Sequence, residues 1–159
     1  MAADLRAASL GTRRSLQSLR SLLVDIYPPN LKTHGLSAAL GDLVAPVASL
    51  GIETELDLRG TEQLSAEDNE LIYRVAREAT RNVLRHADAS ALRITVDATD
   101  GGAVTLIEDD GRGFRAADAS GEGHLGLRVM SDLAADASAV LSIESEPGSG
   151  TRVRLEVPR

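Results

Sequence analysis

Residues 66–86 have the strongest periodic pattern of apolar residues in this chain. This segment constrains the possible folds of the chain more than any other. Apolar residues recur there at three- and four-residue steps, which is the period of an amphipathic helix. Ser65, with Asp68 three residues later, resembles a capping box that opens the helix. The apolar side is formed by Leu71, Ile72, Val75, Ala79 and Val83. A helix with one such side must lie on a second layer, and the segments around it predict a sheet.

Several segments on both sides of this helix have the pattern of strands. The first alternates apolar with acidic side chains, and the next two flank Asp100-Gly101-Gly102, whose glycines suit a tight hairpin. The predicted strands cover residues 52–58, 91–98, 103–108, 139–145 and 151–157. Five strands in mixed order with three or four helices predict an α+β fold, a two-layer sandwich.

Three further helices are predicted, at residues 5–26, at 35–50 with an interruption or bend at Pro46, and at 125–135. The first is stopped by the double proline that follows Tyr27, because neither proline can donate a backbone hydrogen bond. Its apolar stripe is long relative to its polar face. Two interpretations stay open: the helix packs on something outside the rest of this chain, or it lies on its own domain.

Composition excludes several classes of partner. The chain has 159 residues and a formal net charge of −7, and a field of that sign repels nucleic-acid backbones and anionic lipid headgroups. Aromatic residues make up 2% of the chain, which is too few for a base-stacking surface. We expect neither a membrane anchor nor a secretion signal, because no apolar run is long enough. The absence of cysteine fits the cytoplasm.

The long helix also carries a row of polar residues opposite its apolar side. Glu78, Asn82 and His86 follow one another at four-residue steps and therefore share one face. Each of them alone is better explained as a solvated residue on an exposed face. The row gains meaning only together with three glycine-containing motifs further along the chain.

These motifs come at places where ligand loops form. Residues 109–114 (DDGRGF) follow an apolar strand, where Asp109 offers a buried acceptor and the glycines let a backbone approach a flat ligand. Residues 121–127 (GEGHLGL) lead into a helix N-terminus, where unpaired backbone N–H groups favour an anion such as phosphate. Residues 148–151 (GSGT) precede the last strand. Each motif alone is also ordinary turn chemistry.

Taken in order, the polar row and the three motifs resemble the nucleotide-binding core of the GHKL superfamily, which includes sensor histidine kinases and type II topoisomerases. The resemblance covers about residues 64–157 and is closest to bacterial two-component histidine kinases of the NarL/DesK type. Residues 73–87 are similar to that family's N box, 109–114 to its G1 box and 123–130 to its G2 box. It implies the Bergerat type of two-layer sandwich, with a mixed sheet of about five strands covered on one face by about three helices, plus an N-terminal helix.

The resemblance implies ATP and Mg²⁺ as cofactors and gives the polar row its roles. Asn82 would ligate Mg²⁺ through its side-chain oxygen, a hard ligand for a hard cation. Glu78 would be the catalytic residue that holds a Mg-bound or attacking water. Arg85 and His86 would face the phosphates as charge and hydrogen-bond donors.

It also assigns an adenine pocket. Asp109 would accept a hydrogen bond from the exocyclic amine of adenine, and Thr151 would give a hydroxyl to the same base edge. Residues 115–122 would form a lid over the ATP. The other residues expected to bind the nucleotide are Gly111, Gly113, Phe114, Gly123, His124, Leu125, Gly126 and Leu127.

Two departures from the family pattern accompany the resemblance. None of the three histidines, His34, His86 and His124, has the setting of the phospho-accepting histidine. We therefore expect a remnant of the second dimerisation helix and a linker over residues 1–34, and an ATP-binding catalytic domain over residues 35–159. The second departure is that Val129 and residues 134–138 stand where relatives often carry glycine.

The sequence thus predicts an enzyme domain, the ATP-binding catalytic domain of a two-component sensor histidine kinase that would not phosphorylate itself alone. Its expected partners are ATP, the kinase's own dimerisation domain and a cognate response regulator, without nucleic acid or direct membrane contact. Two alternatives stay open. An anti-sigma-factor-type serine kinase of the same superfamily is disfavoured by the helix and double proline before the core. A partner-binding module without nucleotide is disfavoured by the intact Glu78, Asn82 and Asp109.

Overall fold

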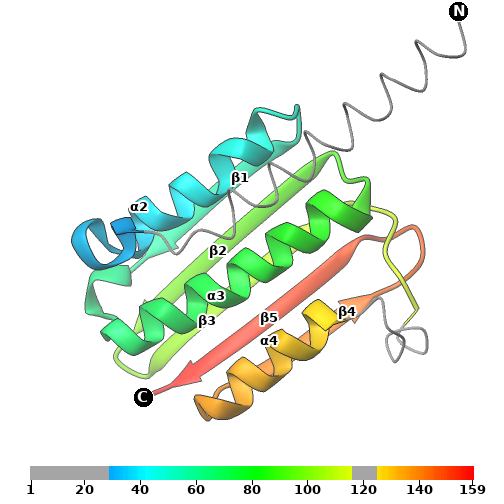
Figure 1. Cartoon of the computed structure of the whole chain (residues 1–159). Helices are drawn as coiled ribbons and strands as arrows, with labels where there is room; N and C mark the ends of the chain where they lie inside the picture. Colours follow the sequence, from blue (N-terminus) through cyan, green and yellow to red (C-terminus); the bar gives the residue numbers. More distant parts are fainter. Residues whose placement is uncertain (1–28, 116–124) are drawn as a thin grey trace, which may run out of the picture.

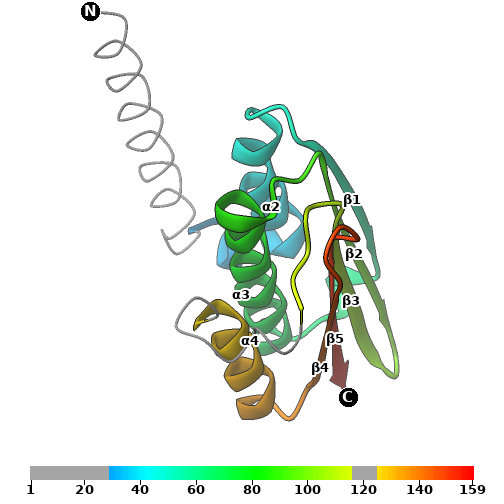
Figure 2. The same ribbon diagram turned by 90° about the vertical axis from the view of Figure 1, so that its right-hand side faces the viewer.

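One layer of the fold is a five-stranded mixed sheet, and the other is made of helices that cover one of its faces (Figures 1 and 2). This computed structural model describes residues 29–115 and 125–159. The strands, in the spatial order β1-β2-β3-β5-β4, are β1 Glu53–Arg59, β2 Ala91–Thr99, β3 Gly102–Asp109, β5 Thr151–Pro158 and β4 Val140–Ser145. The helices within the described residues are α2 Pro29–Ala48, α3 Ala66–Asn82 and α4 Leu125–Asp136. The predicted α+β two-layer sandwich is confirmed.

Strand pairing follows from the connections between the strands. β1 pairs in parallel with β2, because α3 crosses over between them, and the other pairs are antiparallel. β2 and β3 form the predicted hairpin. Because β5 returns beside β3, Asp109 at the end of β3 lies directly opposite Thr151 at the start of β5. This register brings together two motifs that are far apart in the sequence.

α3 lies across the middle of the sheet, between α2 and α4 (Figure 1). The Asp68 N–H donates to the Ser65 hydroxyl at 3.0 Å and the Ser65 N–H donates to the Asp68 carboxylate, so the capping box is confirmed. All the predicted apolar-side residues are buried. The end of the helix differs from the prediction. Val83–Ala87 is a π-helical turn, and the Ala87 carbonyl accepts the N–H of Arg112 at 2.7 Å.

α2 extends further toward the N-terminus than predicted and is kinked at Gly35. It begins at Pro29, a residue type that fits the first helical position because no N–H is needed there. Its non-helical residue is Gly35, with φ 81° and ψ 178°, a conformation that is essentially restricted to glycine. The helix is not interrupted at Pro46, since it continues to Ala48. Pro46 lies so close to that end that the hydrogen bond it cannot make is one of the last in the helix.

One hydrophobic core fills the space between the two layers. It combines the inward faces of the helices with the inward residues of the strands. Its largest fully buried side chains include Leu40, Ile72, Ile94, Met130 and Leu155. Because α2 and α4 both contribute to this core, all three described helices are held against the same face of the sheet.

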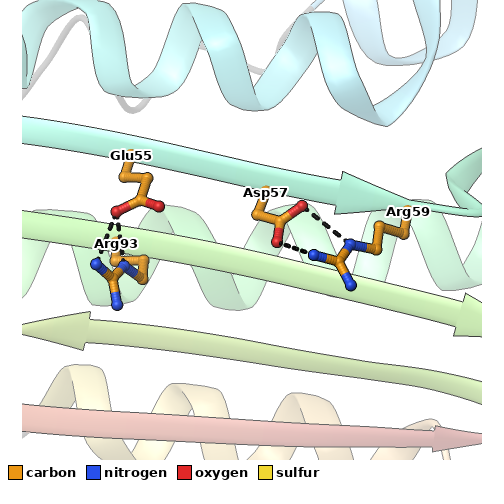
Figure 3. A network of polar contacts seen from close by, with 4 residues as sticks. All are labelled: Glu55, Asp57, Arg59 and Arg93. Carbon is orange, nitrogen blue, oxygen red and sulfur yellow. Dashed lines mark hydrogen bonds and ion pairs between the residues drawn. The ribbon is translucent and has the colours of Figure 1, made fainter.

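The opposite face of the sheet carries charged side chains in register. One row across the five strands alternates in sign and consists of Glu55, Arg93, Glu108, Arg152 and Glu144. Arg93 and Glu55 pair at 2.8 Å beside the pair formed by Arg59 and Asp57 at 2.7 Å (Figure 3). Exposed pairs of this kind contribute at most ~1 kcal/mol each. These charged side chains keep the outer face of the sheet solvated.

Some predictions fall on residues outside the described ranges. These are the helix over residues 5–26, the lid after Arg115, and two of the expected phosphate ligands, Gly123 and His124. Within residues 29–115 and 125–159, none of the helices is both long and apolar enough to cross a membrane.

Candidate functional site

A cavity of about 640 Å³ lies between the helix layer and the ends of β3 and β5. α3 and its π-helical turn form one wall, α4 contributes to another, and the segments after β3 and before β5 close the end. The lining residues are Ala79, Asn82, Val83, His86, Ala87, Ile107, Asp109, Arg112, Gly113, Phe114, Arg115, Leu127, Met130, Pro147, Thr151 and Val153. A mostly apolar cavity of this size with a few convergent polar groups is typical of a small-molecule site.

Asp109 is the acidic group at the sheet end of this cavity. Its Oδ1 accepts the N–H of Gly111 at 2.9 Å. Burial raises the pKa of the Asp109 carboxyl and the charge of Asp110 raises it further, while hydrogen bonds from the N–H groups of Gly111 and Thr151 lower it. Thr151 lies across from Asp109 and also lines the cavity. The two motifs therefore present a carboxylate and a hydroxyl side by side.

The loop after β3 can reach its position only because glycine occupies one site. Gly113 has φ +60°, and a Cβ there would lie 2.0 Å from the backbone oxygen of Glu146. The loop is also tied down by Asp110, whose Oδ1 accepts the N–H groups of Ser90 and Ala91 at 2.7 and 2.8 Å. These contacts fix the backbone that passes the cavity.

The other end of the cavity is where α3 meets the N-terminus of α4. A Cβ on Gly126 would lie 2.2 Å from Glu78 Oε1 and 2.9 Å from Asn82 Oδ1, so the α4 backbone rests directly on these two side chains. Glu78 is 5% exposed. A guanidinium nitrogen of Arg81 lies 3.3 Å from Glu78 Oε1, but the oxygen has no hydrogen-bond partner in the structure. The contact with Arg81 is thus an ion pair without hydrogen-bond geometry.

This end fits a divalent cation that takes most of its ligands from elsewhere. In the described part of the chain, no cluster of three or more His, Asp and Glu residues could hold a metal by itself. The amide oxygen of Asn82 and the orphaned carboxylate oxygen of Glu78 meet at Gly126. Mg²⁺ usually keeps several waters and adds one or two protein oxygens and the substrate's phosphates. The donor set is suited to that role.

Half of the predicted site residues meet at the cavity. Its lining includes Asn82, His86, Asp109, Gly113, Phe114, Leu127 and Thr151. Glu78, Gly111 and Gly126 do not line it but are buried against lining residues. Arg85 and Leu125 are exposed and are not part of the lining.

Other lining residues were not predicted from the sequence. Ile107, Val153 and Met130 form apolar parts of the wall. The alternation of the strands could have indicated Ile107 and Val153, and the helical spacing from Leu127 could have indicated Met130. Arg112 and Arg115 add positive charge beside them. Nothing in the sequence distinguishes these two arginines from other exposed ones, because their position depends on how the loop leaves β3.

A family model described as "Histidine kinase-, DNA gyrase B-, and HSP90-like ATPase" matches residues 67–159, more than half of the chain. The chain belongs to this ATPase family. The matched range holds every residue of both cavity ends. The resemblance expected from the polar row and the glycine motifs is therefore confirmed.

A known relative of this ATPase domain is the sensor histidine kinase MctS of Rhizobium johnstonii, which is 38% identical over 149 residues. That match covers 91% of this chain and 32% of MctS, so the chain spans about a third of the relative's length.

Solved structures of the same fold include the blue-light activated histidine kinase of Erythrobacter litoralis EL346. This kinase is 26% identical to the chain, and the two structures superpose with a TM-score of 0.64. The match covers 77% of this chain and 41% of the kinase chain. Full-length ShkA in complex with AMPPNP is 21% identical with a TM-score of 0.60, covering 96% of this chain and 38% of that one. The second likeness concerns the fold alone.

Proposed function

We propose that this chain is the ATP-binding catalytic domain of a two-component sensor histidine kinase. The observation that carries the proposal is the single cavity that joins two chemically different ends. One end has a half-buried carboxylate, Asp109, and the other has the amide oxygen of Asn82, with the Glu78 carboxylate next to it at the N-terminus of α4. A base with an exocyclic amine fits the first end and a metal-bound phosphate fits the second. The relative MctS, named a sensor histidine kinase, supports the assignment.

At the sheet end, the Asp109 carboxylate would accept the exocyclic amine of adenine. The apolar side chains of Ile107, Met130 and Val153 would contact the faces and edges of the base. A base with a carbonyl in place of the amine would cover the half-buried carboxylate without giving it a donor, and such mismatches are strongly rejected. The raised pKa of Asp109 indicates that the carboxylate is poorly solvated without such a donor.

At the α4 end, Asn82 would hold Mg²⁺ together with phosphate oxygens, and Glu78 would hold a water beside it. When bound, Mg²⁺ would neutralise charge on the phosphate oxygens. His86, Arg112 and Arg115 line the cavity and would add hydrogen bonds and positive charge. Phosphoryl transfer needs little covalent help from a protein, so these residues would act by positioning and by electrostatics.

The acceptor of the phosphoryl group would be a histidine on the kinase's dimerisation domain, and a response regulator would receive it next. We infer that residues 1–34 join this domain to that partner and that the catalytic domain starts near residue 35. The family model, which is described as an ATPase, supports ATP as the nucleotide.

Titration calorimetry with AMPPNP, with and without Mg²⁺, tests the nucleotide site. We expect saturable, Mg²⁺-dependent binding to the wild-type chain and at least tenfold weaker binding to Asp109→Asn, because a hydrogen bond to a charged group contributes ~1.5–3 kcal/mol. Asp97→Asn is the matched control, since Asp97 is exposed on the outer face of the same sheet. Absence of binding to the folded wild-type chain would contradict the proposal and favour a partner-binding module.

Incubation with γ-labelled ATP tests the phosphotransfer part. We expect no stable label on this chain, because none of its three histidines is the acceptor. Stable label on His34, His86 or His124 would contradict the proposal. Transfer of label to serine on a partner protein would favour the serine-kinase alternative.

A further inference from the structure

Ser145, at the end of β4, connects three segments that border the cavity. Its Oγ lies 3.0 Å from the backbone nitrogen of Phe114, 2.8 Å from the carbonyl oxygen of Gly150 and 3.1 Å from Thr151 Oγ1. Phe114 belongs to the loop after β3, and Gly150 and Thr151 belong to the turn and strand that follow β4. Ser145 itself does not line the cavity, whereas Phe114 and Thr151 do.

The direction of each of these hydrogen bonds follows from elimination. A serine hydroxyl has one proton to donate and two lone pairs. The Phe114 N–H can only donate to it, and the Gly150 carbonyl can only accept from it. The single Ser145 proton is therefore used on Gly150. The remaining contact requires Thr151 to donate its own hydroxyl proton to Ser145 Oγ.

This direction changes what Thr151 offers to a ligand. With its proton directed at Ser145, Thr151 Oγ1 presents only lone pairs to the cavity. The neighbouring Asp109 carboxylate is also an acceptor. Both polar groups at this end therefore match a donor such as an exocyclic amine and oppose a carbonyl. The hydroxyl that Thr151 is expected to give to the base edge would therefore act through its lone pairs.

We propose that Ser145 is a positioning residue that determines purine specificity by holding Thr151 as an acceptor. The inference rests on the proposed function, because it concerns the base of the same nucleotide. Without the Ser145 hydroxyl, the Thr151 proton is free to rotate toward the cavity. It then donates to the carbonyl of a 6-oxopurine, and discrimination between amino- and oxopurines weakens.

Calorimetric affinities for ADP and IDP test this proposal. ADP has an amine at C6 of the purine and no proton on N1, whereas IDP has a carbonyl at C6 and a proton on N1. We expect the wild-type chain to prefer ADP, and Ser145→Ala to reduce the ratio of the two affinities about tenfold, mainly through tighter IDP binding. Ser145→Thr, which keeps the hydroxyl, restores the ratio. Ser142→Ala, an exposed position on the same strand, leaves it at the wild-type value.

Two further variants distinguish specificity from general damage. In Ser145→Ala combined with Thr151→Val the gain in IDP affinity disappears, because it depends on the Thr151 hydroxyl. If Ser145→Ala does not fold, the nearly isosteric Ser145→Cys carries the test, with a smaller shift in the same direction.

The outcomes separate this inference from the proposed function. A wild-type chain that prefers ADP, with an unchanged ratio in folded Ser145→Ala or Ser145→Cys, would overturn the role of Ser145 and leave the adenine pocket standing. A folded wild-type chain that binds neither nucleotide would overturn both.

Discussion

Asp109 is the residue on which the site depends most. Its carboxyl lies in a mostly apolar cavity, and burial is the largest cause of its raised pKa. Two backbone N–H groups oppose this effect without cancelling it. The folded chain therefore holds a poorly solvated carboxyl group at this position, and a donor from a bound base would stabilise its charged form.

The raised pKa predicts how Asp109 affects stability with pH. Between the ordinary and the raised pKa, the folded chain binds more protons than the unfolded chain, so this group's contribution to the free energy of unfolding falls as pH rises. Asp109→Asn should therefore gain stability relative to wild type as pH rises from acid to neutral. Urea unfolding at several pH values measures this. A difference between the two chains that does not vary with pH would contradict it, and Asp97→Asn serves as the exposed control.

Gly126 is expected to be essential at the other end of the cavity. In Gly126→Ala the new methyl group would lie 2.2 Å from Glu78 Oε1, so Glu78 and Asn82 must both move. We expect a lower melting temperature and loss of the Mg²⁺-dependent part of AMPPNP affinity, with weak Mg²⁺-independent binding retained. Gly101→Ala is the control, because its nearest neighbour would be 3.8 Å away. Unchanged Mg²⁺ dependence in Gly126→Ala would show that Asn82 and Glu78 do not hold the metal.

At the scale of elements, the C-terminus of α4 explains one departure from the family pattern. At the end of the helix, the Ala139 N–H donates to the Ala134 carbonyl at 2.8 Å and the Ser138 N–H donates to the Ala135 carbonyl at 3.1 Å. These two hydrogen bonds form a Schellman motif. Ser138 occupies the left-handed position of this motif with φ 56°. The turn thus forms without the glycine that relatives often carry there.

A chain with glycine in place of Ser138 should be more stable than the wild-type chain. Ser138→Gly is expected to raise the free energy of unfolding by about 1 kcal/mol, because a non-glycine residue with positive φ is strained by about that amount. Ser131→Gly, the same substitution within α4, should lower it by about 0.5–1 kcal/mol. Urea denaturation of the two variants gives both values. A loss of stability in Ser138→Gly would mean that the serine side chain stabilises the turn in another way.

The elements that the sequence predicts well are those with a strong period. The strands and α4 agree with their predicted ranges to within about two residues, because alternation and helical spacing reflect burial directly. Residues 29–34 of α2 were not predicted as helical, because a double proline suggests the end of a helix although proline also suits the first helical position. The predicted start at residue 35 coincides with the kink at Gly35, after which the helix runs to Ala48. The π-helical turn at Val83–Ala87 has no periodic signal in the sequence. It coincides with a tertiary hydrogen bond, in which the Ala87 carbonyl accepts the N–H of Arg112.

At the scale of the whole molecule, the site depends on strand order, which a single sequence does not reveal. The motif residues were found because glycines and acids at loop ends are distinctive. Ser145 was not found in this way, since its contacts form only when β4 lies next to β5 and the loop after β3 returns to Ser145.

The hydrophobic core extends beyond the range matched by the ATPase family. α2 precedes that range and buries Leu36, Ala39, Leu40 and Val47 against α3 and the sheet.

The central claim, that one cavity binds an adenine nucleotide from Asp109 to Asn82, is tested most directly by amide chemical-shift mapping. ADP with Mg²⁺ would be titrated into the isotopically labelled chain. We expect saturable shifts at Asp109, Gly113, Thr151 and the end of α3, with residues on the outer face of β1 and β2 unchanged. Shifts confined to that charged outer face, or no saturable shift at millimolar ADP in the folded chain, would contradict it.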